Sequence, residues 1–300
     1  LMAVTPQYAT RSIGTFTVGW VQGNGPAGYF DDRNEGDMLR AQASTSKTIR
    51  GQQMDVLAWP EGSVDIDPAS SEPTRRVLSE ISAAYGAPLL MNAATTRGEQ
   101  TFNSTMLWTT DGSEQSYDKL NPVPFGEYVP DRWLFERLAP DLVSLIQREY
   151  TPGRSAPVMD IGGTRVGLAI CFDVIYDDVI FDAARQGAQV YIFQTNNADF
   201  RGTDENVQQL AIARMRAIET GRAVVNVSTV GTSQVINPDG STEETIGVDT
   251  AAGRVSEVPL RAGITPASWL SPTIEIAMVV ASAGVLLCVR LRIHVRARKR

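Results

Sequence analysis

The chain has 300 residues, is 43% hydrophobic and carries a formal net charge of −7, so it can bury a large core and is acidic overall. Residues 290–300 hold six positive charges and no negative ones, which leaves −13 on residues 1–289. Because phosphate binding needs basic charge on the folded surface, nucleic acid is not an expected partner. One histidine, His294, and two cysteines, Cys171 and Cys288, exclude a disulfide framework and the usual zinc-ligand spacings, so neither a metal nor a cofactor is expected.

Strands and helices alternate along the first part of the chain. Apolar periodicity and β-rich composition predict, in order, strand 15–22, a helix within 33–53, strand 55–59, helix 72–85, and strands 88–91 and 104–108. The boundaries of the helix at 72–85 are the best marked, with Pro73 near its start and Gly86 directly after its end.

The same alternation continues in the second part of the chain. The predicted elements are a helical piece around 131–148, strand 164–170, a helix near 176–186, strand 189–193, helix 204–220 with Gly221 as its stop, and strands 223–228 and 233–236. The stretch 120–155 is rich in proline and aromatic residues and is long for a connection, which is typical of a functional loop. The whole pattern predicts an α/β layered domain.

An apolar segment occupies residues 266–289, where Glu275 is the only charged residue. A helix of about 20 residues spans a bilayer core of roughly 30 Å. Trp269 stands near one end, as an interfacial aromatic does, and the arginines of 290–300 follow the other end. The segment predicts a transmembrane helix, with a buried core helix as the alternative. The positive-inside rule then makes 290–300 a basic cytoplasmic tail and turns the preceding domain outward.

Three apolar segments each lead into a reactive side chain: Glu61, Lys119 and Cys171. A cysteine attacks a carbonyl as a thiolate, and the strand-to-turn position of Cys171 would expose its sulfur beside the amides of the turn. Without a suitable histidine, Glu61 is the available base, and Lys119 would hold an oxyanion and lower the thiol pKa. Each residue taken alone also has an ordinary explanation: a turn glutamate, a surface lysine and a buried, inert cysteine.

In this order, the three residues resemble the Glu-Lys-Cys triad of the nitrilase (carbon–nitrogen hydrolase) superfamily. Residues 118–130, Asp-Lys-Leu-Asn-Pro-Val-Pro-Phe-Gly-Glu-Tyr-Val-Pro, resemble the lysine motif of apolipoprotein N-acyltransferases. Residues 21–24 and 213–222 are also similar to that family's pattern, so the resemblance covers about 16–290.

The resemblance implies a nitrilase-like αββα sandwich followed by one C-terminal transmembrane helix. The catalytic domain would cover 16–262 and the transmembrane helix 266–289. The family's N-terminal bundle of membrane helices has no counterpart in this chain, which begins at Leu1 rather than Met, so residues 1–15 are expected to be a lead-in that remains from such a region.

The same resemblance implies N-acylation of the N-terminal S-diacylglyceryl cysteine of apolipoproteins. Cys171, activated by Glu61, would take a fatty acyl group from a phospholipid as a thioester, with Lys119 and the amide of Phe172 holding the oxyanion. Glu127 would support Lys119. The enzyme would lie in a bacterial cell membrane, with its catalytic domain on the extracytoplasmic face.

Several positions depart from that family's pattern. Phe172 and Asp173 stand where it usually has tyrosine and glutamate, and the loop 196–200 lacks its tryptophan. The family's early tryptophan is also missing, although Tyr29 and Phe30 lie nearby. Two alternatives therefore stay open: a soluble-type amidase or nitrilase that hydrolyses small amides, and a catalytically weakened domain that binds lipoproteins or a partner synthase.

Overall fold

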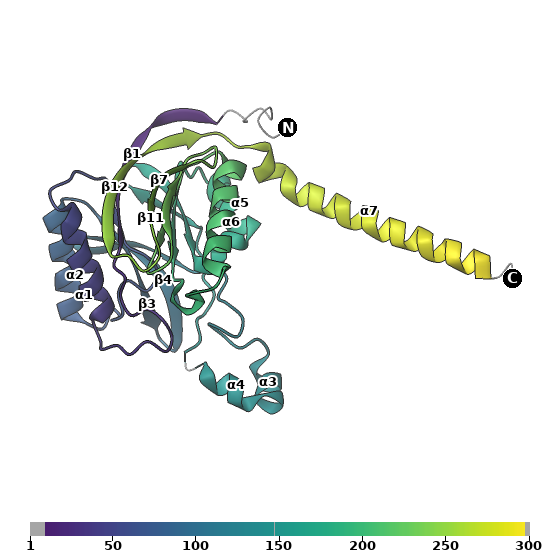
Figure 1. Ribbon diagram of the computed structural model, residues 1–300, viewed down its shortest axis with the longest axis horizontal. Helices are drawn as coiled ribbons and strands as arrows, with labels where there is room; N and C mark the ends of the chain where they lie inside the picture. Colours follow the sequence, from purple (N-terminus) through teal and green to yellow (C-terminus); the bar gives the residue numbers. More distant parts are fainter. Residues whose placement is uncertain (1–9, 147, 298–300) are drawn as a thin grey trace.

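Two six-stranded sheets face each other across a shared apolar core (Figure 1). The structure is a computed structural model that describes residues 10–146 and 148–297. Sheet I has the order β12-β1-β2-β3-β4-β5 and is made of β1 (Arg11–Gln22), β2 (Val56–Ala58), β3 (Leu89–Arg97), β4 (Gln100–Thr109), β5 (Gly112–Asp118) and β12 (Ala252–Ala262). Sheet II has the order β11-β10-β9-β8-β7-β6 and is made of β6 (Val158–Ile161), β7 (Thr164–Ile170), β8 (Val190–Thr195), β9 (Val224–Ser228), β10 (Ser233–Ile236) and β11 (Thr242–Ile246).

Each sheet is parallel at its centre and antiparallel at its edges. The strands β1, β2 and β3 pair in parallel in sheet I, and β7, β8 and β9 do so in sheet II. Parallel strands need crossover connections, and here these carry helices. The carboxyl ends of the central strands are the usual place for a site in such sheets.

Two pairs of helices cover the outer faces of the sheets. The helices α1 (Asp37–Ser46) and α2 (Glu72–Tyr85) pack on sheet I, and α5 (Asp177–Arg185) and α6 (Glu205–Thr220) pack on sheet II. The layers therefore run helix, sheet, sheet, helix, and the predicted αββα sandwich is confirmed. Short 3₁₀ turns follow α1 at Lys47–Ile49 and β7 at Cys171–Ile175, and a third lies at Ala198–Phe200.

The helix at 72–85 has the predicted bounds because both of its ends are specified locally. The hydroxyl of Ser71 accepts a hydrogen bond from the amide of Thr74, and Gly86 ends the helix in the left-handed conformation. The prediction for 131–148 was less accurate. That stretch divides into α3 (Arg132–Leu138) and α4 (Pro140–Leu145), because Pro140 cannot continue the preceding helix.

Four strands were not predicted: β5, β6, β11 and β12. All four are edge strands: β5 and β12 form the two edges of sheet I, and β6 and β11 form those of sheet II. Edge strands carry many exposed polar residues, so they lack the apolar run that marks a central strand. The first strand also begins at Arg11 rather than at residue 15.

The helix α7 (Pro266–Ala297) leaves the sandwich and extends away from it (Figure 1). Its foot is attached to the domain, since Arg185 donates a hydrogen bond to the Ser268 carbonyl (2.9 Å) and Ser271 donates one to Asp177 (3.0 Å). Residues 273–290 are long and apolar enough to cross a membrane, and none of this window is buried. The exposure disfavours the alternative of a buried core helix.

Two predicted terminal segments fall partly outside the described residues. Of the lead-in at 1–15, residues 1–9 lie outside them, and of the basic tail at 290–300, residues 298–300 do.

Candidate active site

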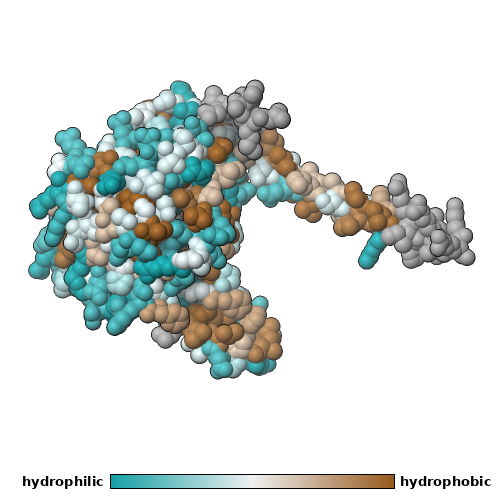
Figure 2. Space-filling model, in the orientation of Figure 1, coloured by the Kyte–Doolittle hydropathy of each residue, from teal (hydrophilic) through white to brown (hydrophobic). Residues whose placement is uncertain are grey.

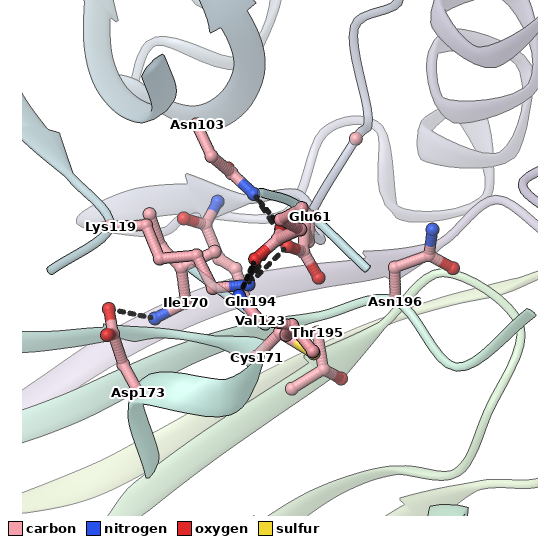
Figure 3. Close-up of polar contacts among 12 residues, drawn as sticks. Glu61, Asn103, Lys119, Val123, Ile170, Cys171, Asp173, Gln194, Thr195 and Asn196 are labelled. Atoms are coloured by element: carbon pink, nitrogen blue, oxygen red, sulfur yellow. Dashed lines mark hydrogen bonds and ion pairs between the residues drawn. The ribbon is translucent and has the colours of Figure 1, made fainter. Parts of the chain in front are cut away.

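The three residues singled out in the sequence come together at one end of the sandwich (Figure 3). Glu61 lies in a turn shortly after β2, Lys119 directly follows β5, and Cys171 directly follows β7. The Lys119 Nζ lies 3.5 Å from Glu61 Oε1, and the Cys171 thiol is close enough to affect the pKa of Glu61. Two sheets thus contribute to one site, with Cys171 from sheet II facing the two charged residues from sheet I.

Cys171 occupies an unusual backbone position. Its φ is +48°, in the left-handed region that non-glycine residues rarely adopt, and it is the first residue of the 3₁₀ turn that ends β7. Such strain at a reactive residue is typical of functional sites. The expectation of an exposed sulfur was wrong, because the residue is only 9% exposed and belongs to the core between the sheets.

Lys119 is buried between two carboxylates. Its Nζ lies 2.8 Å from Glu127 Oε2, and Glu127 is oriented by a hydrogen bond from the Val123 amide (2.7 Å). Burial alone would lower the pKa of Lys119, but the negative charges of Glu61, Cys171 and Glu127 raise it above its usual range. The residue is therefore a fixed cation.

Glu61 is buried and tightly held. Asn103 of β4 donates a hydrogen bond to its Oε1 (2.8 Å), and the Thr229 hydroxyl donates one to its backbone carbonyl (2.7 Å). Burial raises the pKa of Glu61, the ammonium of Lys119 lowers it, and the charge of Glu127 raises it again, with a net shift upward. A carboxyl with a raised pKa is better able to carry a proton near neutral pH.

The pKa of the Cys171 thiol is raised to about 12, first by burial and then by the charge of Glu61. Lys119 and Gln209 act in the opposite direction. Lys119 thus lowers the thiol pKa, as expected, but burial outweighs the ammonium and the net shift is upward. Such a thiol is neutral near neutral pH, so it would act as a nucleophile only with a base to remove its proton.

Asp173 holds the turn after Cys171 against the segment that carries Lys119. It accepts hydrogen bonds from the Tyr117 hydroxyl (2.8 Å) and the Asn121 amide (2.9 Å), which flank Lys119 in the sequence. The residue is fully buried, and burial raises its pKa although Lys119 opposes the shift. Phe172 packs its ring edge-on against Tyr176, with 5.4 Å between the ring centroids.

The far end of the same turn is held by α6. Arg216, which is buried, donates to the carbonyls of Val174 (2.8 Å) and Ile175 (2.7 Å) and pairs with Asp177 (2.6 Å). Asp177 in turn accepts the hydrogen bond from Ser271 at the foot of α7. The turn that begins with Cys171 is thus fixed at both ends.

Three polar residues at the site were not found from the sequence: Asn103, Gln194 and Gln209. Gln194 of β8 donates to the carbonyl of Trp59 (2.6 Å) and so ties sheet II to the strand end before Glu61. Gln209 of α6 donates to the sulfur of Cys171. Amide side chains in strands and helices carry no recognisable sequence signal. Asn103 and Gln194 are identified by their burial at the site, and Gln209 by its contact with the sulfur.

A polar cavity of about 380 Å³ opens onto Glu61. Its lining includes Arg33, Asp65, Asn103, Glu127 and Arg148. A more open cavity of about 630 Å³ lies along residues 51–55 and 84–86, near the amino end of β2 and away from the reactive residues. Within residues 10–146 and 148–297 no group of three or more His, Cys, Asp or Glu side chains is arranged to hold a metal ion.

Residues 17–250 match the family model described as carbon–nitrogen hydrolase. Among curated proteins, the chain is 32% identical to an apolipoprotein N-acyltransferase of Mycolicibacterium smegmatis, over 90% of this chain and 48% of that protein. It is 28% identical to one of Bradyrhizobium diazoefficiens, over 86% of this chain and 49% of that protein. The chain therefore spans about half the length of these relatives.

Among solved structures, the fold is similar to Nit3 of Saccharomyces cerevisiae, described as a member of branch 10 of the nitrilase superfamily. The TM-score is 0.64 at 16% identity, over 83% of this chain and 91% of that one. An amidase from Nesterenkonia sp. superposes with a TM-score of 0.59 at 20% identity, over 82% of this chain and 90% of that one. At such identities the likeness concerns the fold alone.

Proposed function

The chain belongs to the carbon–nitrogen hydrolase family, and from that premise we propose that it transfers a fatty acyl group from a phospholipid to the N-terminal S-diacylglyceryl cysteine of apolipoproteins. Cys171 is the nucleophile, Glu61 the base and Lys119 the oxyanion-stabilising cation. Glu127, Phe172 and Asp173 support them. The observation that carries the proposal is the buried cation Lys119, held between Glu61 and Glu127 beside a thiol.

The first half-reaction moves the acyl group onto sulfur. Glu61 takes the proton of Cys171, and the sulfur attacks the ester carbonyl of the phospholipid. The charge that develops on the carbonyl oxygen is stabilised by Lys119 and by the amide of Phe172. The C–O bond breaks, the departing lysophospholipid oxygen takes the proton from Glu61, and a thioester remains on Cys171.

The second half-reaction moves the acyl group onto nitrogen. The uncharged α-amino group of the lipoprotein cysteine attacks the thioester carbonyl, and Glu61 takes a proton from that nitrogen. The C–S bond breaks, an amide forms, and the sulfur regains its proton from Glu61. The raised pKa of Glu61 supports this part, because the same carboxyl has to accept and return a proton in both halves.

A lipid substrate is supported by apolar surface outside the site. The α3–α4 arm (residues 131–146) extends from the domain and exposes large apolar side chains, including Trp133, Leu138 and Leu142 (Figures 1 and 2). A monomeric soluble protein rarely exposes such a group, which is typical of a membrane or protein contact. The arm also adjoins the cavity, because the Tyr29 hydroxyl donates to the Leu145 carbonyl and Tyr29 lines the cavity.

We also propose a place in the cell. Residues 266–289 cross the bacterial cell membrane, the catalytic domain at 16–262 lies on the extracytoplasmic face, and the arginine-rich tail at 290–300 is cytoplasmic.

Hydrolysis of small amides is the second candidate, and one observation favours it. The cavity beside Glu61 is lined largely by polar and charged side chains, as a small hydrophilic substrate requires. The two candidates differ in the acceptor of the acyl group, which is water in one case and an amine in the other.

The test uses the full chain in detergent micelles with phospholipid and a synthetic S-diacylglyceryl peptide. We expect a peptide product heavier by one acyl group and a hydroxylamine-sensitive acyl adduct on the protein. Cys171→Ser should abolish both, because a serine hydroxyl is far less acidic than a thiol. The matched control, Cys288→Ser, changes the other cysteine and should retain both.

Three results would speak against the proposal. A fully active Cys171→Ser variant would remove the thioester mechanism. Ammonia release from simple amides without peptide acylation would favour the amidase. Tight binding of the peptide with neither reaction would favour a lipoprotein-binding domain.

A further inference from the structure

A side-chain amide contacts the sulfur of Cys171. Gln209, on α6, places its Nε2 3.4 Å from Sγ, and in the described part of the chain it is the side chain that donates a hydrogen bond to this sulfur. Sulfur is large, so this distance is within the range of an N–H···S hydrogen bond. No step of the mechanism above uses this contact.

The neighbours of Gln209 decide which end of its amide faces the sulfur. Asn197 Nδ2 donates to Gln209 Oε1 (2.8 Å), so the oxygen of Gln209 is turned toward Asn197 and its NH₂ group toward Sγ. The oxygen of Asn197 is itself occupied, since it accepts hydrogen bonds from the hydroxyls of Ser228 (2.7 Å) and Thr195 (3.3 Å). The orientation of both amides follows from these bonds.

The hydrogen bonds form a chain with one direction. The Gly231 amide donates to the Ser228 hydroxyl (3.0 Å), Ser228 donates to Asn197, Asn197 donates to Gln209, and Gln209 donates to the sulfur. Bonds aligned in this way polarise one another, which strengthens the last donor. The chain contains no group that titrates near neutral pH, so it favours negative charge on the sulfur at any working pH.

We propose that Gln209 is a catalytic residue that stabilises negative charge on the sulfur of Cys171, with Asn197 as its positioning residue. The inference rests on the proposed function for its chemistry. The sulfur is anionic twice in that reaction: before it attacks the ester, and when it leaves the thioester. Gln209 therefore assists both halves.

The surroundings of the sulfur explain why such a donor is needed. The ammonium of Lys119 is already shared between the carboxylates of Glu61 and Glu127. Burial and the charge of Glu61 raise the pKa of Cys171, while Lys119 and the hydrogen bond from Gln209 lower it. The amide of Gln209 is a neutral donor, so it stabilises the charged sulfur without pairing with either carboxylate.

The test measures how fast methyl methanethiosulfonate converts Cys171 to its methyl disulfide, a reaction that needs the thiolate and releases methanesulfinate. The full chain carries Cys288→Ala so that one thiol is observed. At fixed pH, Gln209→Leu should slow the reaction about tenfold, since a hydrogen bond to a charged group is lost. Gln209→Glu has nearly the same shape but adds negative charge, so it should be slower still.

The matched control is Gln208→Leu, because Gln208 is the exposed neighbour on the same helix. It should react at the wild-type rate. In peptide acylation, Gln209→Leu should lower kcat about tenfold with little change in KM, as expected for a group that acts on the reacting atom. Asn197→Leu should give an intermediate thiol rate.

A purely structural role for Gln209 would not produce thiol reaction rates that fall from the wild type to Gln209→Leu and again to Gln209→Glu. The proposal is overturned if Gln209→Leu reacts like the wild type, if the Leu and Glu variants react equally fast, or if Gln208→Leu slows as much. Should Gln209→Leu fail to fold, the isosteric Gln209→Glu still decides. A wild-type chain that acylates no peptide but shows the ordered thiol rates would refute the proposed function and leave the role of Gln209 intact.

Discussion

The active site and the α3–α4 arm depart from the usual distribution of polarity in opposite directions. At the site, Glu61 and Lys119 are charged yet buried, with Lys119 only 1% exposed. On the arm, Trp133 and Leu138 are apolar yet 64% and 69% exposed. Buried charge and exposed apolar surface each cost stability in a soluble protein. Because both features cost stability, the buried charges and the exposed apolar side chains each call for a functional explanation.

The two regions also differ in how firmly they are held. Each charged group at the site is fixed by hydrogen bonds or ion pairs, whereas α3 contributes no buried residue to the domain. The site is thus preorganised, as the proposed electrostatic catalysis requires. The arm has little to pack against within the chain, which is consistent with a partner outside it.

The largest effect should come from removing the buried cation. Lys119→Met leaves Glu61 and Glu127 facing each other without compensation, so we expect a loss of about 3–5 kcal/mol in the free energy of unfolding and no detectable acyl transfer. Urea unfolding and the acylation assay measure the two effects. The control Arg75→Met breaks the exposed pair with Glu72 and should cost no more than about 1 kcal/mol. Equal costs for the two variants would contradict the contrast between buried and exposed charge.

Removing the apolar helix should have the next largest effect. Deletion of residues 272–300 keeps Ser271 and its bond to Asp177 but removes the window at 273–290, so the chain should lose most of its sedimentation with membranes. A truncated chain that still sediments fully would show that another surface, with the arm as first candidate, is sufficient for attachment.

The buried thiol should show its raised pKa in a pH series. Because the pKa of Cys171 is raised to about 12, the thiolate fraction should grow about tenfold for each pH unit up to about pH 11, without a plateau. Modification rates in the Cys288→Ala background measure this, and the urea-unfolded chain should reach its plateau near pH 9. Between about pH 9 and about pH 12 the folded chain keeps the Cys171 proton that the unfolded chain has released. The contribution of Cys171 to the free energy of unfolding therefore falls as pH rises through this range. A plateau near pH 9 in the folded chain would place the sulfur in solvent.

The smallest effect on folding should come from the arm. Leu138→Glu combined with Leu142→Glu replaces two exposed side chains, so the free energy of unfolding should change by no more than about 0.5 kcal/mol for each. Binding of the chain truncated at Ser271 to phospholipid vesicles should nevertheless fall about tenfold or more, because apolar burial in the bilayer is lost and charge is added. Glu136→Gln on the same arm is the control and should bind vesicles at least as well as the parent. Unchanged vesicle binding of the double variant would show that the arm does not contact lipid.

Local signals in the sequence predicted the elements whose ends are specified by neighbouring residues. Helix 72–85 had Pro73 near its start and Gly86 directly after its end, and strand 164–170 was a continuous apolar run, so both were found with their bounds. The edge strands β5 and β11 were missed because their patterns depend on what lies beside them. Glu61, Lys119 and Cys171 could be recognised because each lies in a short motif whose residues are adjacent in the chain.

The sequence by itself determined the layered α/β class, the apolar C-terminal helix and the three residues around which the chemistry is proposed. Only the tertiary structure decided that the cysteine is buried with a raised pKa, that Lys119 is shared between two carboxylates, and that Gln209 reaches the sulfur. The physical reason is distance along the chain. Glu61 and Lys119 are 58 residues apart and Cys171 and Gln209 are 38 apart, so their contacts exist only once the chain has folded.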